Sequence, residues 1–191
     1  MVMSPQAVKA LNAINLGEKI AAVGHVSLGT FTRNMQSGEK LESNDRSKTV
    51  ARYGAPHYTF HRADLLDALA AGIDARSVHL GHRLASAKEH SDRVTLNFEN
   101  GHQVEAEYVI GADGVRSVLR KTLYGDDNPS YTGQMVWRAL LPAEKIPEEI
   151  LEPVGHTEWV GPGCHFRAYF IRQKKVINIV TQQDTDQWVE E

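Results

Sequence analysis

The stretch from Tyr108 to Arg120 constrains the fold more strongly than any other part of this chain of 191 residues. It opens with apolar and β-branched residues, as a buried strand of a parallel sheet does. Gly111 and Gly114 follow, and glycine permits positive φ and lets a ligand approach the backbone closely. Apolar residues then recur at helical spacing, so the pattern predicts a strand, a glycine turn and a helix. The start of such a helix has free N–H groups and the positive end of a dipole, which suits a phosphate.

Polar side chains in the same turn could complete a nucleotide site. Asp113 offers a carboxylate for sugar hydroxyls, and Arg116 offers a positive charge for a phosphate. An ordinary βα turn with two glycines has the same spacing, so the spacing alone leaves both interpretations open. The run Gly111–Arg120, GADGVRSVLR, closely resembles the GADGxxSxVR fingerprint of single-component FAD-dependent aromatic hydroxylases, with Leu119 where that family usually has valine. The resemblance implies that Asp113, Gly114 and Arg116 contact FAD, and that the protein uses NAD(P)H.

A second stretch, His61–Leu69, points to the same family. Its leucines share one helical face, which predicts a helix from Arg62 onward. A cation in the first turn opposes the helix dipole, and a surface arginine that is solvated or paired with Asp64 would explain it without any function. The pattern HRADLLDAL also resembles the HRxDLxxxL helix start of the same family, in which the arginine reaches the FAD. By position, Leu84 corresponds to family residues whose backbone contacts adenine.

The remaining pattern predicts short helices and antiparallel strands. Ser4 and Pro5 are typical of a helix start, and Asn100–Gly101 is a strong hairpin turn. Alternation along 94–99 predicts that Val94 and its apolar neighbours face a core. Helices are expected from Pro5 to about Leu16, at 18–23, at 142–151 (or a turn there) and from 184. A mobile loop or ragged edge strand is expected at 43–55. Strands are expected at 25–33, 39–42, 78–80, 83–90, 94–99, 102–105, 131–141, 156–160, 165–171 and 175–181.

The resemblance implies an α/β (α+β) fold in two parts. Residues 1–127 correspond to a partial FAD-binding domain of the glutathione-reductase type, and residues 128–191 to part of an antiparallel-sheet substrate domain. The boundary is placed at the polar turn 125–129. The GxGxxG turn that begins such a family member, and its GD motif, are not found. The sequence is therefore interpreted as the middle of such a protein, and the chain alone is not expected to hold FAD tightly.

Two polar residues are candidates for contact with a substrate. His165 and Tyr169 lie four residues apart, on one face of the predicted strand 165–171. They could hydrogen-bond a ring hydroxyl or carboxylate and aid its deprotonation, although ordinary polar positions of a half-exposed strand would look the same. The resemblance places this strand beside the substrate ring, and 6-hydroxynicotinate-type hydroxylases have a similar His-x-x-x-Tyr. Arg138, beside Trp137, is more simply explained as structural.

Composition excludes several classes of function. A formal net charge of −3 lacks the basic character of a nucleic-acid binder. The single cysteine, Cys164, forms no intrachain disulfide and fits a cytoplasmic protein. No apolar run approaches the length of a membrane span, no signal peptide is visible, and the histidines lack the ligand spacing of a metal site.

The function expected from the resemblance is a FAD-dependent, NAD(P)H-using monooxygenase. It would use O2 to hydroxylate a small aromatic substrate, either a phenolic or a hydroxypyridine carboxylate. Two alternatives stay open: a non-catalytic remnant or interaction module of the same fold, and another flavoprotein of that fold, such as an epoxidase or reductase. The identity of the substrate, the choice of NADH or NADPH, and the oligomeric state are not determined by the sequence.

Overall fold

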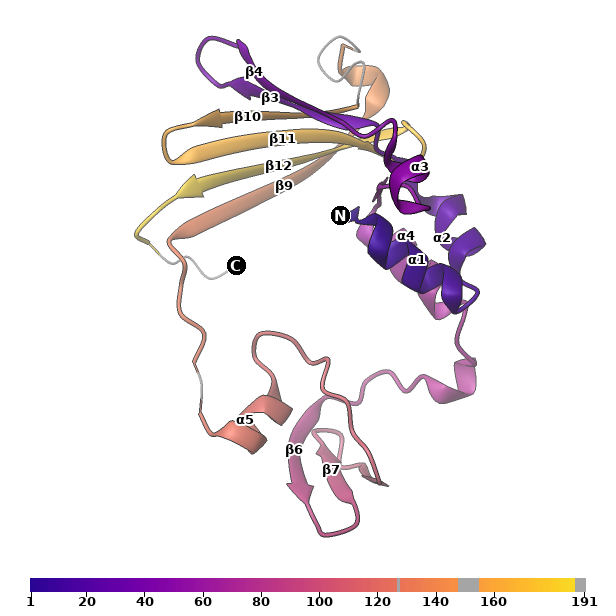
Figure 1. Cartoon of the computed structure of the whole chain (residues 1–191). Helices are drawn as coiled ribbons and strands as arrows, with labels where there is room; N and C mark the ends of the chain where they lie inside the picture. The colour runs from indigo at the N-terminus through magenta and orange to yellow at the C-terminus, as the bar shows by residue number, and fades with distance from the viewer. Residues whose placement is uncertain (127, 148–154, 188–191) are drawn as a thin grey trace. The chain divides into compact units, whose positions relative to one another are not determined.

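A computed structural model describes residues 1–126, 128–147 and 155–187 (Figure 1). The chain divides into two compact units, Met1–Ile73 with Gly133–Glu191, and Asp74–Thr132. We call the first the sheet unit and the second the meander unit. The predicted division into a FAD-binding part, 1–127, and a substrate part, 128–191, stays a prediction about function.

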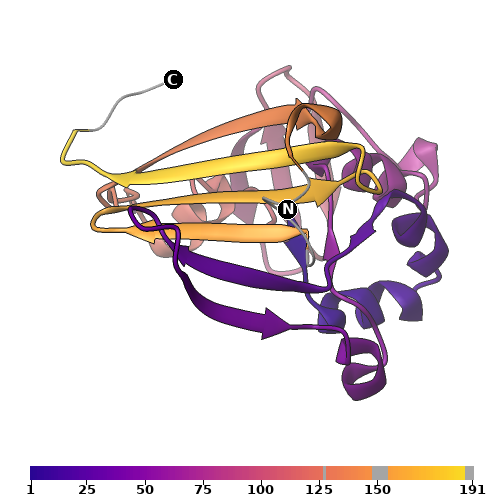
Figure 2. The ribbon, with the colours of Figure 1, turned by 90° about the horizontal axis from the view of Figure 1, so that it is seen from above.

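A six-stranded sheet of order β4-β3-β10-β11-β12-β9 dominates the sheet unit. Figure 2 shows its strands lying side by side. Every neighbouring pair is antiparallel except β10 with β3, which run parallel. The strands predicted at 25–33 and 39–42 therefore contribute to the same sheet as the strands near the end of the chain. The strands are β3 (Gly29–Asn34), β4 (Lys40–Asp45), β9 (Gln134–Pro142), β10 (His156–Gly161), β11 (Cys164–Ile171) and β12 (Val176–Asp184).

Four short helices and a small sheet make the rest of the sheet unit. Ser4 stands at the N-cap of α1 with Pro5 after it, as predicted, although the serine side chain makes no capping hydrogen bond. The small sheet has the order β1-β5-β2. The elements are α1 (Pro5–Ala13), α2 (Gly17–Val23), α3 (Thr49–Tyr53), α4 (Arg62–Ala70), β1 (Val2–Met3), β2 (His25–Val26) and β5 (Tyr58–Thr59).

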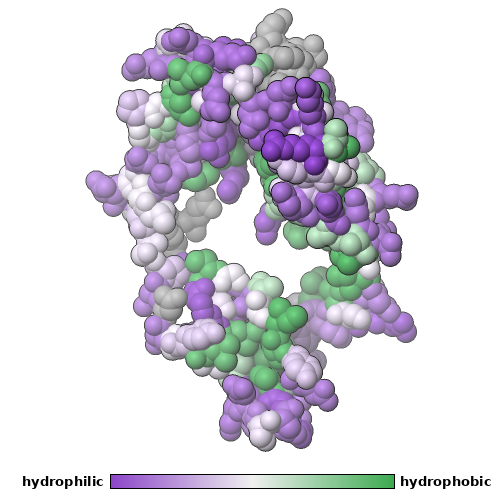
Figure 3. Space-filling model, viewed as in Figure 1, coloured by the Kyte–Doolittle hydropathy of each residue, from purple (hydrophilic) through white to green (hydrophobic). Residues whose placement is uncertain are grey.

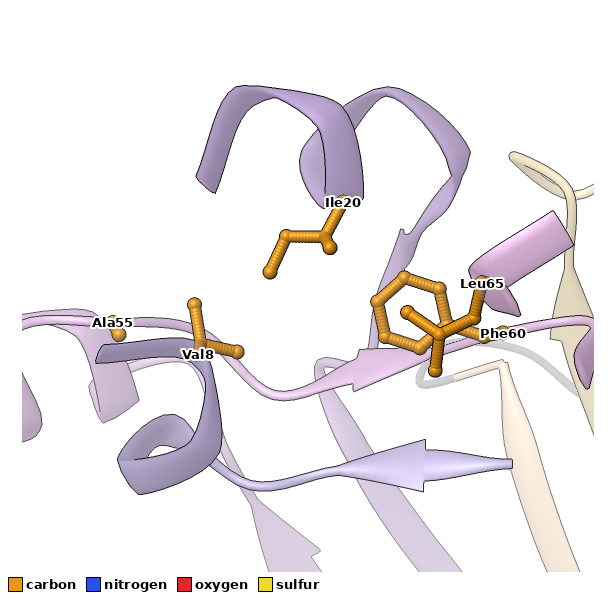
Figure 4. Close-up of a cluster of buried hydrophobic side chains, with 5 residues drawn as sticks. All are labelled: Val8, Ile20, Ala55, Phe60 and Leu65. Atoms are coloured by element: carbon orange, nitrogen blue, oxygen red, sulfur yellow. The ribbon is translucent and has the colours of Figure 1, made fainter. Parts of the chain in front are cut away.

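These helices bury a common apolar cluster. Val8, Ile20, Ala55, Phe60 and Leu65 form it, and Figure 4 shows their side chains gathered between the helices. Burial of one large apolar side chain contributes about 1.5–3 kcal/mol. The cluster therefore holds α4, and with it the HRADL sequence at its start, in a defined place against β1 and β5.

The two faces of the large sheet differ in chemistry. On one face Ala168, Phe170 and Ile177 form a second apolar cluster, with Trp159 and Ile146 packed against it. Because side chains alternate along a strand, the intervening residues lie on the opposite face. That opposite face carries arginine, glutamate, histidine and tyrosine side chains, and the candidate site lies on it. The short helix η2 (Ala143–Lys145) follows β9, where a helix or turn was predicted; residues 148–151 of that prediction lie outside the described residues.

The meander unit contains the predicted antiparallel meander. Its strands β6 (Leu84–Glu89), β7 (Val94–Phe98) and β8 (Gln103–Ala106) lie in sequence order, with Gly101 in the turn at a φ of 83°. The prediction that Val94 and its apolar neighbours face a core is wrong in detail, because Thr95 is the buried residue of β7. Its hydroxyl lies 2.9 Å from the His90 imidazole. The unit also holds η1 (Ala75–Ser77) and α5 (Val118–Tyr124).

Two predicted strands of this unit are absent from its described residues. Residues 78–80 follow η1 without strand pairing, and residues 108–110 form no strand. Tyr108 and Ile110 are 88% and 93% exposed, although their sequence is that of a buried strand. Apolar side chains show as green surface on this unit in Figure 3. A β-strand is defined by its hydrogen bonds to a neighbouring strand, and no described residue pairs in this way with residues 108–110.

Two further predictions need correction. The segment 43–55 was predicted as a mobile loop or a ragged edge strand; its first residues are the end of the edge strand β4, but the helix α3, capped by Gly54 in the left-handed conformation, was not predicted. The helix expected from 184 does not begin there, because Asp184 is the last residue of β12; residues 188–191 lie outside the described part of the chain. None of the described helices is long and apolar enough to cross a membrane.

Candidate functional site

An open pocket of about 890 Å³ lies on the polar face of the six-stranded sheet, entirely within the sheet unit. We call it the sheet pocket. Its floor comes from all six strands and from Arg46 just after β4, and one wall comes from β1 and the start of α4. The floor residues are Thr30, Thr32, Glu42, Asn44, Arg46, Arg138, Leu140, His156, Glu158, Arg167, Tyr169, Asn178 and Val180; the wall residues are Met1, Val2, Phe60, His61 and Arg62.

Strand register orders the floor of the sheet pocket in rows. In one row Leu140, Asn178, Tyr169 and His156 are successive cross-strand partners from β9 to β10. The next row holds Arg138, Val180, Arg167 and Glu158 in the same order of strands. Directly opposite side chains in such rows are close neighbours. The whole floor brings together residues up to 150 positions apart in the sequence, Thr30 and Val180.

The sheet pocket carries an excess of positive charge. Four arginines and two glutamates line it, a formal surplus of two positive charges. Glu158 forms an ion pair with Arg167, and Arg46 donates a hydrogen bond to Ser27. Arg138 makes no ion pair or hydrogen bond with any described residue, so its guanidinium can bind an anion. The sequence favoured a structural role for this arginine, and the structure instead places it on the pocket floor.

Tyr169, a predicted site residue, lies in the middle of this floor and is 6% exposed. Burial raises the pKa of its phenol, and the charges of Arg138 and Arg167 oppose that shift. The phenol therefore stays protonated at neutral pH and can donate a hydrogen bond as well as accept one. Its oxygen accepts a hydrogen bond from the Met1 amino group at 3.1 Å.

Arg62, predicted to reach FAD, lines the wall of the sheet pocket at the first residue of α4. Of its two simpler explanations, a pair with Asp64 does not hold, because Asp64 binds Arg172 instead, whereas a solvated side chain agrees with the exposure of Arg62. Both carboxylate oxygens of Asp64 lie 2.7 Å from nitrogens of Arg172, and His61 adds a contact at 3.1 Å. Hydrogen bonds from Arg172, the largest effect, help to lower the pKa of Asp64 to about 2. The Asp64 carboxylate thus anchors α4 to the turn between β11 and β12 and leaves Arg62 free to face the pocket.

His165 shares a strand with Tyr169 but does not line the sheet pocket. It lies four residues away, near the start of β11, beside a second cavity of about 520 Å³. This cavity is mostly apolar and is also lined by Met35, Cys164 and Trp159. The Nε2 atom of His165 is buried without a hydrogen-bond partner among the described residues. The structure therefore does not bring the two predicted substrate residues together in one pocket.

The glycine turn with Asp113 and Gly114 lies in the meander unit, before α5. The Asp113 carboxylate accepts hydrogen bonds from the Ser117 hydroxyl at 2.6 Å and from the Val118 and Leu119 N–H groups at 2.7 and 3.2 Å. These bonds, that of Ser117 foremost, lower the pKa of Asp113, which is consequently ionised at neutral pH. Asp113 therefore orders the start of α5, a role that the sequence did not predict.

The other predicted cofactor residues of the meander unit have open surroundings. Gly114 has a φ of 80°, and a Cβ built on it would meet no atom within 4 Å, so a ligand can approach this backbone. Arg116 is exposed, and Leu84 begins β6. Their contacts with FAD stay predictions. Within the described residues no group of three or more histidine, cysteine or acidic side chains could hold a metal ion.

Comparison with known proteins places the chain in a family. The model of the FAD binding domain family matches residues 1–162. The chain belongs to this family. A curated relative, the 3-amino-4-hydroxybenzoate 2-monooxygenase of Streptomyces cremeus, is 37% identical over 170 residues, which are 87% of this chain and 42% of that protein. The 6-hydroxynicotinate 3-monooxygenase of Bordetella bronchiseptica is 31% identical over 192 residues, which are 97% of this chain and 49% of that protein.

Solved structures confirm the predicted α/β fold. Klebsiella pneumoniae HpxO complexed with FAD and uric acid has a TM-score of 0.88 at 23% identity, covering all of this chain and 48% of that one. A salicylate hydroxylase substrate complex has a TM-score of 0.79 at 22% identity, with coverage of 100% and 51%. The chain thus spans about half the length of the relatives it matches. The predicted family of FAD-dependent aromatic hydroxylases is confirmed, and the named relatives do not favour the alternatives of a non-catalytic module, an epoxidase or a reductase.

Proposed function

We propose that this protein is a FAD-dependent, NAD(P)H-using monooxygenase that hydroxylates a small aromatic carboxylate in the sheet pocket. The observation that carries the proposal is the unpaired Arg138 on a floor with surplus positive charge, beside the buried phenol of Tyr169. An arginine fork binds a carboxylate through two parallel hydrogen bonds. The names of both curated relatives above describe aromatic carboxylates that carry a ring hydroxyl.

Arg62 is the residue of the sheet pocket that we propose as a FAD contact. Arg62 faces the pocket without an ion-pair partner among the described residues, so it can bind an electronegative edge of FAD. Leu84, Asp113, Gly114 and Arg116 are proposed as further FAD contacts. Bound FAD, once reduced by NAD(P)H, would supply the activation of O2 that hydroxylation requires.

The chain's own residues would then bind and orient the substrate. Arg138 attracts the carboxylate, and Tyr169 donates a hydrogen bond to an oxygen of the ring substituents. Leu140 and Val180 add apolar surface beside them, which lowers the local dielectric and strengthens these polar contacts. His165 is retained as a proposed site residue, beside the neighbouring cavity. A cytoplasmic location is likewise proposed, on the single cysteine.

The test uses the protein produced from its own gene, supplied with FAD, NADH or NADPH, and isotopically labelled O2. Trial substrates are 3-amino-4-hydroxybenzoate, 6-hydroxynicotinate and salicylate, and mass spectrometry follows the label into product. We expect one labelled oxygen atom in the product of at least one substrate. Arg138→Met should raise KM for that substrate about 10- to 100-fold with a smaller effect on kcat. NAD(P)H oxidation that no aromatic carboxylate stimulates, with no label in any product, would refute the proposal.

A further inference from the structure

His156 is the least satisfied polar side chain that lines the sheet pocket. It is 8% exposed, and neither of its ring nitrogens has a hydrogen-bond partner among the described residues. Buried polar atoms are nearly always hydrogen-bonded, because an unpaired one lowers the stability of the fold. Two unpaired nitrogens on one buried ring therefore point to a group that binds there.

Thr30 lies beside His156 and likewise has a buried polar atom without a hydrogen-bond partner among the described residues. Phe31 pairs with Thr157 in the parallel ladder of β3 and β10, so the residues just before them are neighbours on the other face of the sheet. The buried polar atom of Thr30 is its hydroxyl oxygen. Both side chains line the sheet pocket. Three unpaired polar atoms are thus gathered at the β3–β10 seam of the floor.

The chemistry of these atoms selects a neutral hydroxyl rather than an anion. Burial, assisted by the charge of Arg46, lowers the pKa of His156 to about 4. The ring is consequently neutral at pH 7, with one N–H donor and one acceptor nitrogen. Thr30 likewise offers both a donor and an acceptor. A phenolic hydroxyl matches both groups because it donates one hydrogen bond and accepts others, whereas a carboxylate accepts only.

The order of the strands also places the proposed hydroxyl site and the proposed carboxylate site, Arg138, at opposite ends of a bound ring. Arg138 is on β9 and His156 is on β10, with β12 and β11 between them, and Tyr169 is the direct cross-strand partner of His156. Three strand spacings of about 4.8 Å separate the two backbones by roughly 14 Å, before either side chain reaches inward. A ring with its carboxylate toward Arg138 directs its opposite end toward the β3–β10 seam.

We propose that His156 and Thr30 bind the ring hydroxyl of a hydroxylated aromatic carboxylate whose carboxylate faces Arg138. The proposal rests on the proposed function for the choice of an aromatic acid. The centroids of the His156 and Tyr169 rings lie 5.0 Å apart. In the proposed complex both side chains contact the substrate. Recognition of a hydroxyl by groups that are otherwise unpaired discriminates strongly against a substrate that lacks it.

The test measures binding without FAD or NAD(P)H. Benzoate and 4-hydroxybenzoate are titrated into the purified protein by calorimetry at pH 7, and the imidazole nitrogen signals are followed by NMR. We expect 4-hydroxybenzoate to bind about 10-fold more tightly than benzoate. His156→Phe should abolish that preference and leave benzoate affinity within about twofold, and Thr30→Val should reduce the preference about threefold. His156→Gln, which retains a donor and an acceptor, should restore part of it. The His156 nitrogen signals should shift with 4-hydroxybenzoate and not with benzoate.

His57 provides a matched control. It is another histidine with a partly unsatisfied ring, its Nδ1 being unpaired among the described residues, and it does not line the sheet pocket. His57→Phe should leave the preference for the hydroxyl unchanged. A preference that survives in His156→Phe, equal binding of the two acids, or binding of neither overturns the proposal. If the hydroxylation assay fails but the protein still prefers 4-hydroxybenzoate in a way that depends on His156, the proposed monooxygenase activity is refuted and the proposed hydroxyl subsite is not.

Discussion

Asp64→Asn tests the anchor between α4 and the β11–β12 turn. The Asp64 side chain is 20% exposed and accepts two hydrogen bonds of 2.7 Å from Arg172. The fall of its pKa from 3.8 to about 2 corresponds to at most roughly 2.4 kcal/mol, at about 1.36 kcal/mol per pKa unit. Because the Arg172 side chain is 46% exposed, solvent screens the pair, and we expect Asp64→Asn to cost about 1 kcal/mol at pH 7.

The pH dependence distinguishes this ion pair from a packing effect. The folded-state pKa of Asp64 lies below its unfolded value, so the stabilisation is fully present above about pH 4.5 and is lost as the pH falls toward 2. About half of the difference between the parent and Asp64→Asn should therefore be gone at pH 3. The assay is urea denaturation followed by far-UV circular dichroism at pH 7, 5 and 3, which gives the free energy of unfolding of both proteins.

Two further variants complete this test. Arg172→Gln should destabilise the protein in the same direction, and the double variant should lose little more than Asp64→Asn does alone. Asp74→Asn is the matched control, because Asp74 pairs with Arg76 on an exposed turn and should leave the unfolding midpoint nearly unchanged. An equal loss at pH 7 and pH 3, or a variant as stable as the parent, would refute the reasoning.

Three other predictions follow from the site and the fold. Tyr169→Phe keeps the buried ring and should leave the melting temperature nearly unchanged, while lowering kcat/KM about 10- to 100-fold and raising NAD(P)H oxidation without product; unchanged coupling would remove Tyr169 from the site. In a protein extended to the length of its relatives, Arg62→Ala and Asp113→Ala should each weaken FAD binding about 10-fold in equilibrium dialysis, and a variant that binds FAD like the parent would contradict the assigned role. Gly155→Ala should destabilise the sheet unit by about 1–3 kcal/mol in urea titrations, because Gly155 has a φ of 68° and a Cβ there would lie 2.9 Å from the Phe170 ring; an unchanged midpoint would exclude that clash.

Local signals in the sequence predicted the elements whose structure depends on near neighbours. The helix starting at Arg62, the two helices α1 and α2 near the start of the chain, the meander with its turn at Gly101, and the four strands near the end of the chain were all confirmed. Each of these depends on helical or alternating periodicity, or on a turn residue with the required φ. The family was likewise predicted from two short motifs, because fingerprints around Asp113 and Arg62 are themselves local.

Elements that need a distant partner were predicted less well. Residues 108–110 have the composition of a buried strand, but no described residue supplies the hydrogen bonds that a strand requires. The partner of Asp64 is Arg172, 108 residues away, and not the arginine two positions before it. His165 and Tyr169 share a strand face by alternation, yet they border different cavities: the cavity beside His165 is also lined by Ala168 of the second apolar cluster and by Trp159, which packs against that cluster.

The sequence by itself thus determined the family, the local elements and the chemical types of residue available for a site. The tertiary structure decided which of those residues meet: the parallel pairing of β3 with β10 places Thr30 beside His156, and the order of four strands sets Arg138 opposite them. The physical reason is that strand register and sheet order follow from the burial of a whole apolar face, to which residues throughout the chain contribute. No window of sequence contains that information, so the convergence of unpaired polar atoms on the pocket floor is visible in the folded chain alone.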